Sequence, residues 1–239
     1  MDWPFLWESG GQAMPVFQLG EKLQFPPVHL ATDDGLLAVG GDLSPERLLL
    51  AYRFGIFPWF SEGDPILWWS PSPRLILELD ELKISKRLQR TLRQKLFEVT
   101  MDSAFVQVIT RCSDRPRRDQ HDTWITSEMI TAYTHLHDLG FAHSVECWQD
   151  GKIVGGLYGI AMGGVFFGES MFSAVADSSK VALVSLTKKL IQWDFDFIDC
   201  QIKNDHLLRL GAKEIAGELF RKRLAVSVDR PGKYGKWNL

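Results

Sequence analysis

Apolar and polar positions follow no regular period in the first part of the chain and become periodic after it. The exception in the first part is the stretch that follows Ser44 and Pro45, because a serine cap and a proline at the first helical position predict a helix. Prolines, glycines and tryptophans fill most of the remainder, and the prolines of SPSPR end it. We therefore expect a small N-terminal domain over residues 1–72 and a larger domain over residues 73–239.

Short apolar runs in the second part predict strands. These runs cover residues 74–79, 97–101, 142–149, 152–162, 165–170, 197–203 and 224–228. Asp150-Gly151 and Gly163-Gly164 separate three consecutive runs. Since both dipeptides favour tight hairpin turns, these three strands are expected to form an antiparallel meander.

Capped stretches with a period of 3.6 residues predict the helices between these strands. They cover residues 86–96, 103–112, 127–139, 178–193 and 204–211, the first three after the caps Ser85, Asp102 and Thr126. The last residues, 229–239, are expected to form a loose tail. The pattern as a whole predicts an α+β fold with one central sheet and flanking helices.

Composition narrows the class of protein. The chain has 239 residues, 45% of them hydrophobic and 24% charged, which is ordinary for a globular protein. Its net charge of −3 means that nucleic acid could bind only at a local basic patch. The three cysteines are far apart, which argues against a disulfide framework or a zinc site and fits a reducing cytoplasm. No signal peptide and no membrane-spanning run are recognisable.

The stretch VFFGESMFS places one acid, Glu169, among large apolar residues. A buried charge without a partner is costly, so such a group is usually paired, protonated or ready for a cationic ligand. One interpretation is a ligand site; the other is an ion pair with a lysine such as Lys180. Strict alternation would place Glu169 on the face of Phe167 and Met171, but Gly168 could introduce a bulge that redirects it.

The strand FIDCQIK carries the second candidate group. Alternation puts Asp199 and Gln201 on one face and Ile198, Cys200 and Ile202 on the other. The acid could orient the amide, whose oxygen could hold an attacking amine. The alternative is a sheet edge with two solvated polar groups.

A basic helix follows Ser85. Lys86, Arg87, Arg90 and Arg93 surround its leucine stripe, and residues 86, 90 and 93 share one face. Such a face can follow a phosphate backbone, or it can be a solvated surface. A second basic loop, with Arg111, Arg115, Arg117 and Arg118, gives a weaker signal because acids are interspersed.

Trp59 and Trp124 lie near turns. Exposed aromatic rings next to basic patches can stack on unpaired bases, although the same rings could pack a domain interface.

Several strings together make the chain resemble the bacterial leucyl/phenylalanyl-tRNA–protein transferases. They are GLLAVGGDLSPERLLLAY, GIFPWFSEGDPILWWSP, DTWIT, GGLYGIA, FFGESMFS, IDCQIKNDH and LGAKEI. They occur in the family's order and cover residues 35–215, whereas both ends of the chain match poorly.

The resemblance implies a small N-terminal domain and a GNAT-like C-terminal domain with a mixed, mainly antiparallel central sheet. It also implies a reaction: transfer of leucine or phenylalanine from aminoacyl-tRNA to the α-amine of proteins that begin with Arg or Lys, which marks them for N-end rule degradation. No metal, nucleotide or coenzyme A is needed. The partners would be leucyl- or phenylalanyl-tRNA and the acceptor protein, with no membrane, and we expect a monomer in the cytoplasm.

The resemblance also implies roles for residues. Glu169 matches the glutamate beside the acceptor site, where it would meet the cationic N-terminal residue or its ammonium. Asp199 and Gln201 match the pair at the reactive centre. The apolar pocket for the transferred side chain is implied to consist of Leu157, Phe166, Met171, Leu183, Leu186 and Ile198. Leu157 and Leu186 replace the methionine and phenylalanine of familiar members, which alters the shape of the pocket.

The tRNA contacts are implied in the same way. Trp59 and Trp124 match tryptophans beside the terminal adenosine, and the helix with Lys86, Arg87, Arg90 and Arg93 matches the one proposed to touch the acceptor stem. Two other functions compete with this one. A GNAT enzyme that uses acyl-CoA would need a glycine-rich pyrophosphate loop, which MFSAVAD does not provide. A non-catalytic module that binds RNA or basic N-termini would not need Asp199 and Gln201.

Overall fold

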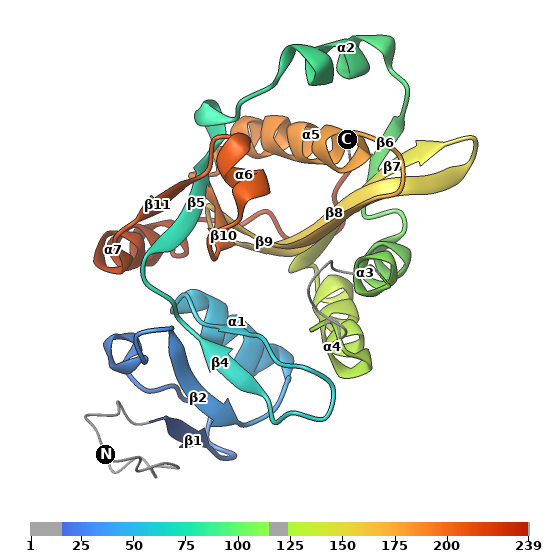
Figure 1. Cartoon of the computed structure of the whole chain (residues 1–239). Helices are drawn as coiled ribbons and strands as arrows, with labels where there is room; N and C mark the ends of the chain where they lie inside the picture. Colours follow the sequence, from blue (N-terminus) through green and yellow to red (C-terminus); the bar gives the residue numbers. More distant parts are fainter. Residues whose placement is uncertain (1–15, 115–123, 239) are drawn as a thin grey trace.

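A computed structural model describes residues 16–114 and 124–238 of the chain, in two sheets (Figure 1). The smaller sheet has the order β1-β2-β4-β3 and comes from the first part of the sequence. Its strands are β1 (Phe17–Leu19), β2 (Leu36–Gly40), β3 (Phe57–Pro58) and β4 (Leu67–Trp69), and it is accompanied by the 3-10 turn η1 (Val28–Leu30) and helix α1 (Pro45–Arg53). β1 pairs with β2 in parallel, and the other pairs are antiparallel.

The larger sheet has the order β11-β5-β10-β9-β8-β7-β6. Its strands are β5 (Arg74–Glu78), β6 (Glu98–Met101), β7 (Ala142–Gln149), β8 (Lys152–Met162), β9 (Val165–Ser173), β10 (Phe197–Gln201) and β11 (Lys213–Ile215). All of its pairs are antiparallel except β9 with β10. The predicted α+β fold with a mixed, mainly antiparallel sheet is confirmed.

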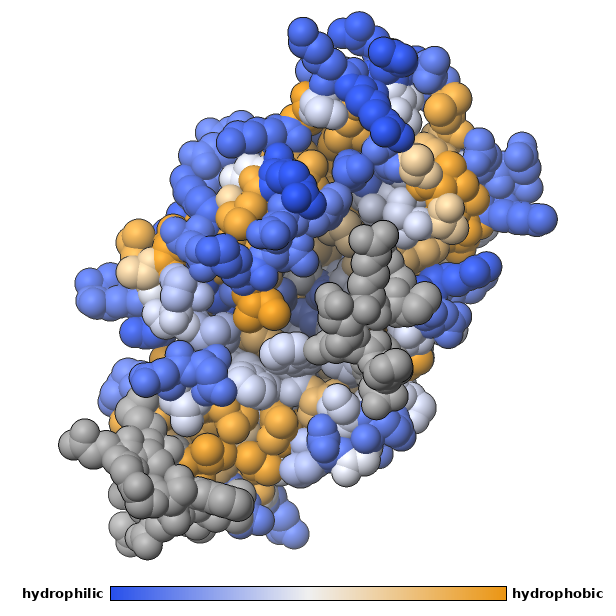
Figure 2. Space-filling model, in the orientation of Figure 1, coloured by the Kyte–Doolittle hydropathy of each residue, from blue (hydrophilic) through white to orange (hydrophobic). Residues whose placement is uncertain are grey.

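Helices cover both faces of this sheet (Figure 1). They are α2 (Lys86–Gln94), α3 (Phe105–Ser113), α4 (Ser127–Asp138), α5 (Ser178–Gln192), α6 (Asp205–Arg209) and α7 (Gly217–Ser227), with the 3-10 turn η2 (Leu79–Glu81) before α2. Helix α5 packs on β7, β8 and β9, and α2 lies beyond α5. Hydrophilic side chains cover α2 at the top of the molecule (Figure 2).

The sheet separates two apolar clusters, because successive side chains of a strand point to opposite faces. Leu75 and Leu77 of β5 join the cluster on the α5 side, whereas Ile76 between them joins the other cluster. That second cluster includes α3, α4 and the small sheet with α1. The N-terminal part of the chain therefore packs on one face of the larger sheet, where it can contribute side chains to a common site.

The predicted helix caps explain where several helices begin. The hydroxyls of Ser44, Ser85 and Thr126 accept hydrogen bonds from the backbone N–H groups of Arg47, Leu88 and Met129. The meander β7-β8-β9 and both of its hairpins are confirmed.

Three expectations about the chain after residue 100 are wrong. Residues 224–227 belong to helix α7 and Val228 is its C-cap, so no strand forms there, because Phe220 and Leu224 are buried one turn apart. The predicted cap Asp102 does not cap α3. It adopts a φ of +51°, and its carboxylate accepts hydrogen bonds from His143 and from the backbone N–H of Trp237.

These contacts order the C-terminal segment that was expected to be loose. The ring of Trp237 is 1% exposed and stacks on His143 with a centroid distance of 3.6 Å. A buried tryptophan contributes a large apolar area, so this segment is held against the larger sheet.

All three cysteines are buried, and none of them forms a disulfide. Among the described residues, no helix combines the length and the apolar character that a membrane span requires, and no group of His, Cys, Asp and Glu could hold a metal ion. The expected second basic loop lies largely outside the described residues. The domain boundary after residue 72 stays a prediction.

Candidate active site

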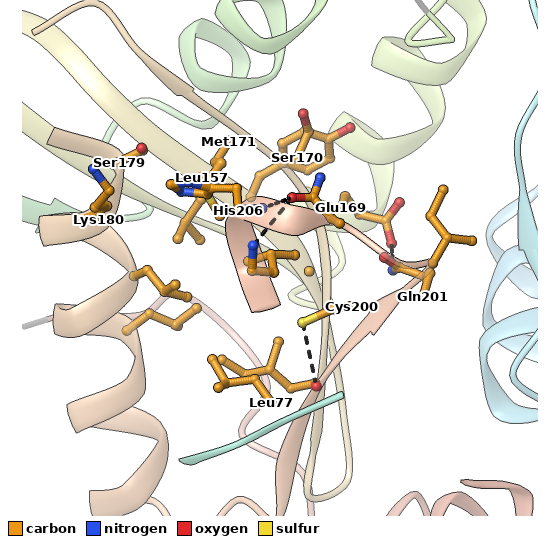
Figure 3. A pocket seen from close by; sticks show the side chains of 18 of the residues that line it. Leu77, Leu157, Glu169, Ser170, Met171, Ser179, Lys180, Cys200, Gln201 and His206 are labelled. Atoms are coloured by element: carbon orange, nitrogen blue, oxygen red, sulfur yellow. Dashed lines mark hydrogen bonds between the residues drawn. The ribbon is translucent and has the colours of Figure 1, made fainter. Parts of the chain in front are cut away.

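A cavity of about 820 Å³ opens where the small sheet, β9, β10 and α5 approach one another. The sequence-predicted residues that line it are Trp59, Trp124, Leu157, Phe166, Glu169, Met171, Leu183, Leu186, Ile198, Gln201 and the basic residue Arg87. Figure 3 shows Lys180 on the α5 side of this cavity and Gln201 on the opposite side. The structure therefore brings most of the predicted site residues to one place, while Asp199, Lys86, Arg90 and Arg93 lie outside the lining.

The inner part of the cavity is apolar. Leu77 of β5, Leu157 of β8 and Ile198 of β10 meet Leu183 and Leu186 of α5 there, and all five are buried. Leu77, Leu157 and Ile198 share the sheet face toward α5, because each strand directs alternate residues to that side. Phe166 and Met171 of β9 complete the predicted lining, and Leu77 joins it without having been predicted.

Glu169 is the bulged residue of β9. Tyr158 of β8 pairs with Ser170 and Gly159 pairs with Gly168, so Glu169 has no partner in the ladder. The bulge expected next to Gly168 is therefore present, but Glu169 stays on the side of Phe167, because both residues contact Tyr52. The alternative partner Lys180 is 2.9 Å from Asp177 instead, and no salt bridge joins Glu169 to a described residue.

Neutral donors surround the Glu169 carboxylate. Oε1 accepts hydrogen bonds from the hydroxyl of Tyr52 at 2.8 Å and from Nε2 of Gln201 at 3.2 Å, and Oε2 lies 3.4 Å from the hydroxyl of Tyr133. The two tyrosine hydroxyls also hydrogen-bond to each other. Burial raises the pKa of Glu169 to about 8, although the hydrogen bonds from the tyrosines act in the opposite direction.

Gln201 ends β10 in a left-handed conformation with φ of +57°. Its backbone N–H donates to Oδ1 of Asp199 at 3.0 Å, and the pairing of β10 with β5 shifts register between these two residues. Non-glycine residues adopt this conformation only when their surroundings stabilise it. The Asp199 carboxylate thus stabilises the turn that directs the Gln201 amide to Glu169.

Asp199 does not line the cavity. Its side chain is fully buried, and both oxygens accept hydrogen bonds from Arg74, from Nε at 2.8 Å and from Nη2 at 2.7 Å. The Arg74 guanidinium lies over the rings of Phe57 and Phe220, at 4.9 and 4.6 Å from their centroids. The expectation that Asp199 and Gln201 project together from one strand face is wrong, because the bulge after Asp199 separates them.

Trp59 and Trp124 line the cavity from segments outside the larger sheet. Trp59 follows β3, and its carbonyl accepts a hydrogen bond from the indole of Trp69 at 2.7 Å. Trp124 precedes α4, and both rings are partly exposed in the cavity lining. Partly exposed rings keep a face available for stacking.

The basic helix α2 lies beside the cavity. Lys86, Arg90 and Arg93 are exposed, and no ion pair joins them to another described residue. Arg87 differs, since it lines the cavity and its Nε is 3.2 Å from Asp177. A charged face without internal partners is available to a polyanion.

Sequence reasoning missed Arg74, Tyr52 and Tyr133. Arg74 ends the proline-rich segment SPSPR and Tyr52 lies in a helix with an ordinary apolar stripe, so neither had a local signal. The buried positions of Tyr52 and Tyr133 on α1 and α4 look like core positions of amphipathic helices. Only the packing of three distant segments reveals their role.

The arrangement can support acyl transfer to an amine. It combines an apolar hole, a buried carboxylate that lacks a cation, and an oriented amide. Cys200 also lines the cavity, but burial raises the pKa of its thiol and its Sγ lies 3.9 Å from the carbonyl of Ile198. A thiol with a raised pKa is a poor nucleophile, so direct attack by the acceptor is favoured over a covalent intermediate.

Two protein-family models match the chain. Residues 76–225 match the leucyl/phenylalanyl-tRNA protein transferase family, and residues 41–72 match the N-terminal domain of the same family. A leucyl/phenylalanyl-tRNA–protein transferase of Syntrophobacter fumaroxidans is 58% identical over 90% of this chain and 92% of its own length. One of Desulforapulum autotrophicum is 53% identical over 94% of this chain and 98% of its own length.

Solved structures are much more distant. A functionally unknown conserved protein of Staphylococcus epidermidis is 10% identical over 76% of this chain and 68% of its own, with a TM-score of 0.40. A likeness at this level bears on neither fold nor function.

Proposed function

The chain belongs to the leucyl/phenylalanyl-tRNA–protein transferase family, and we propose that it transfers leucine or phenylalanine from aminoacyl-tRNA to the N-terminal α-amine of proteins that begin with Arg or Lys. It is an enzyme of the aminoacyltransferase class. The acceptors would be marked for N-end rule degradation, and the protein would act in the cytoplasm as a monomer.

One observation carries the acceptor part of the proposal. Glu169 is a carboxylate in an apolar cavity, and its partners among the described residues are neutral hydroxyls and an amide. An arriving cation supplies the missing charge and lowers the pKa of Glu169 from about 8. The attacking α-amine must be neutral, so the cation that stays beside Glu169 is the Arg or Lys side chain.

The reaction needs little chemistry from the protein, because the aminoacyl ester is already activated. The amine nitrogen attacks the ester carbonyl, a new amide bond forms, and the ester C–O bond breaks. The nitrogen loses a proton and the ribose oxygen gains one. Catalysis then consists mainly of placing the amine against the carbonyl.

Gln201 is proposed to hold the amine. Its Nε2 donates to Glu169, which leaves the amide oxygen to accept an N–H of the acceptor. Asp199 would act through the backbone N–H of Gln201, since Arg74 already neutralises its charge.

The apolar hole is proposed to take the leucine or phenylalanine side chain. Trp59 and Trp124 would stack beside the terminal adenosine, and Lys86, Arg87, Arg90 and Arg93 would contact phosphates of the acceptor stem. Contacts of this kind position the tRNA without reading its sequence.

The acyl-CoA alternative is disfavoured by the segment between β9 and α5. Asp177, which precedes α5, places a carboxylate where such enzymes bind pyrophosphate, and residues 174–177 contain no glycine. A carboxylate at that place repels an anionic ligand. The proposed enzyme and the non-catalytic alternative predict different results in an assay of aminoacyl transfer.

The assay measures labelled leucine transferred from leucyl-tRNA to an Arg-initiated peptide. We expect transfer by the native protein and a loss of kcat/KM of about 100-fold or more in Gln201→Met, in line with the removal of a placed polar group. Gln192→Met, at the exposed end of α5, is the matched control and should retain native activity. No transfer by the native protein, or equal activity of both variants, would contradict the proposal.

A further inference from the structure

The exposed basic face of α2 has to stand at a fixed distance from the cavity if one tRNA is to use both. Figure 1 shows α2 on the outer side of α5, connected to the larger sheet by chain segments at each end. Leu88 is the buried residue of this helix, while Ile84 and Leu92 are partly buried against the same cluster. Apolar contacts are not directional, so they leave the orientation of α2 loosely defined.

Polar contacts from α2 to the rest of the described chain meet at one atom. Oδ2 of Asp177 lies 3.2 Å from Nε of Arg87 and 3.4 Å from the hydroxyl of Thr91. Arg87 and Thr91 are one turn apart, so the two contacts define both a position along α2 and a rotation about its axis. The remaining side-chain hydrogen bonds of α2 stay within residues 84–94.

Asp177 is itself firmly placed. Its carboxylate is 8% exposed, Oδ1 accepts a hydrogen bond from Nζ of Lys180 at 2.9 Å, and its backbone has a φ of +70°. The hydrogen bond from Lys180, together with the charges of Lys180 and Arg87, lowers the pKa of Asp177. An ionised, oriented carboxylate at the start of α5 is a rigid reference point for α2.

Asp177 also belongs to the cavity. Asp177, Arg87 and Lys180 all line it, together with Leu183 of the same helix α5. Asp177 therefore lines the cavity and also contacts the basic helix α2. A displacement of α2 would move Lys86, Arg90 and Arg93 relative to the place where the aminoacyl end must lie.

We propose that Asp177 is a positioning residue that fixes α2 relative to the cavity, so that an acceptor stem held on α2 delivers its aminoacylated end into the apolar hole. This inference rests on the proposed aminoacyl-tRNA transfer. Asp177 does not touch the reacting atoms; it acts through Arg87 and Thr91. It should therefore matter for a whole tRNA and not for a substrate that lacks the acceptor stem.

The test compares two donor substrates, leucyl-tRNA and 3′-leucyl-adenosine, which carries the reacting ester and the terminal nucleoside alone. The variant Asp177→Asn removes the charge and keeps a residue that tolerates positive φ. Asp150→Asn is the matched control, because Asp150 also has a positive φ but lies in the β7–β8 hairpin and does not line the cavity. Thermal denaturation of both variants checks that the fold is kept.

For Asp177→Asn we expect KM for leucyl-tRNA to rise about 3- to 5-fold, because the Arg87 side chain is 74% exposed and loss of an exposed ion pair has effects of this order. The kcat/KM for leucyl-adenosine should stay native, and Asp150→Asn should be native with both donors. The salt dependence of tRNA affinity should flatten in Asp177→Asn, because fewer cations then reach phosphates. Arg90→Glu, which removes a cation from the exposed face of α2, is the reference variant and should flatten it too.

Equal losses with both donors would overturn the inference, since Asp177 would then act inside the cavity. Native behaviour with both donors would overturn it as well. Failure of the native protein to use either donor would instead contradict the proposed function, so the two failures are distinguishable.

Discussion

Asp199 and Glu169 are buried carboxylates on the neighbouring strands β10 and β9, and their surroundings differ in charge. Asp199 is held by two hydrogen bonds from the Arg74 guanidinium, behind the cavity. Glu169 lies in the cavity and receives hydrogen bonds from Tyr52, Tyr133 and Gln201, which are all neutral.

The difference separates a structural carboxylate from a functional one. A buried ion pair with both oxygens hydrogen-bonded is satisfied within the fold, so Asp199 has no remaining need for a ligand. Glu169 has hydrogen bonds but no countercharge among the described residues, and burial raises its pKa to about 8. The Glu169 carboxylate therefore lacks a positive partner, which a cationic ligand can supply.

The largest expected effect concerns the ion pair of Asp199. Arg74→Met leaves the Asp199 charge buried without its partner, which should lower the free energy of unfolding by about 3–5 kcal/mol. Chemical denaturation measures this change. The matched control is Arg223→Met, because Arg223 forms a similar two-bond pair with Glu78 but is 31% exposed. Its pair should contribute only about 1 kcal/mol or less.

A loss in Arg74→Met no greater than that in Arg223→Met would contradict the assignment of Asp199 to the scaffold. In that case the pair would not differ from a surface salt bridge, and the distinction between the two buried carboxylates would disappear.

An effect of comparable size should appear in the pH dependence of stability. The pKa of Glu169 rises from 4.5 to about 8 on folding, so the native state retains a proton that the unfolded state has lost between these pH values. The favourable contribution is complete below pH 4.5 and is lost as the pH rises through about 8. The slope should approach 1.4 kcal/mol per pH unit.

Glu169→Gln removes this titrating carboxyl group. The pH dependence due to all other titratable groups cancels when the two proteins are compared. The free energy of unfolding of the native protein relative to Glu169→Gln should therefore fall as the pH is raised from 5 to 7.5. A difference that is independent of pH would show that Glu169 is not forced to hold a proton by burial.

The sequence predicted the cavity better than the groups that set its chemistry. The apolar residues of β8, β9, β10 and α5 lie in strongly periodic segments, so alternation and helical period place them correctly. The bulge at Glu169 was predicted from the neighbouring Gly168, which is a local signal in the sequence. The same reasoning failed at Gln201, because the left-handed turn there depends on Asp199 and on the Arg74 that holds it.

Contacts between distant segments explain the remaining errors. Tyr52 and Glu169 are 117 residues apart in sequence, and Arg74 and Asp199 are 125 apart. Neither spacing nor composition encodes such pairs. Helix α7 was mistaken for a strand because its end, LAVSV, has local strand propensity, whereas burial of Phe220 and Leu224 determines a helix.

The most direct test of the role of Glu169 uses two acceptor peptides, one beginning with arginine and the other with citrulline, its neutral isostere. With leucyl-tRNA as donor, the native protein should prefer the arginine peptide in kcat/KM by about 10–100-fold, the range for a charged hydrogen-bonded contact. Glu169→Gln should bring this ratio close to one while KM for leucyl-tRNA stays native. A preference that persists unchanged in Glu169→Gln would contradict the account.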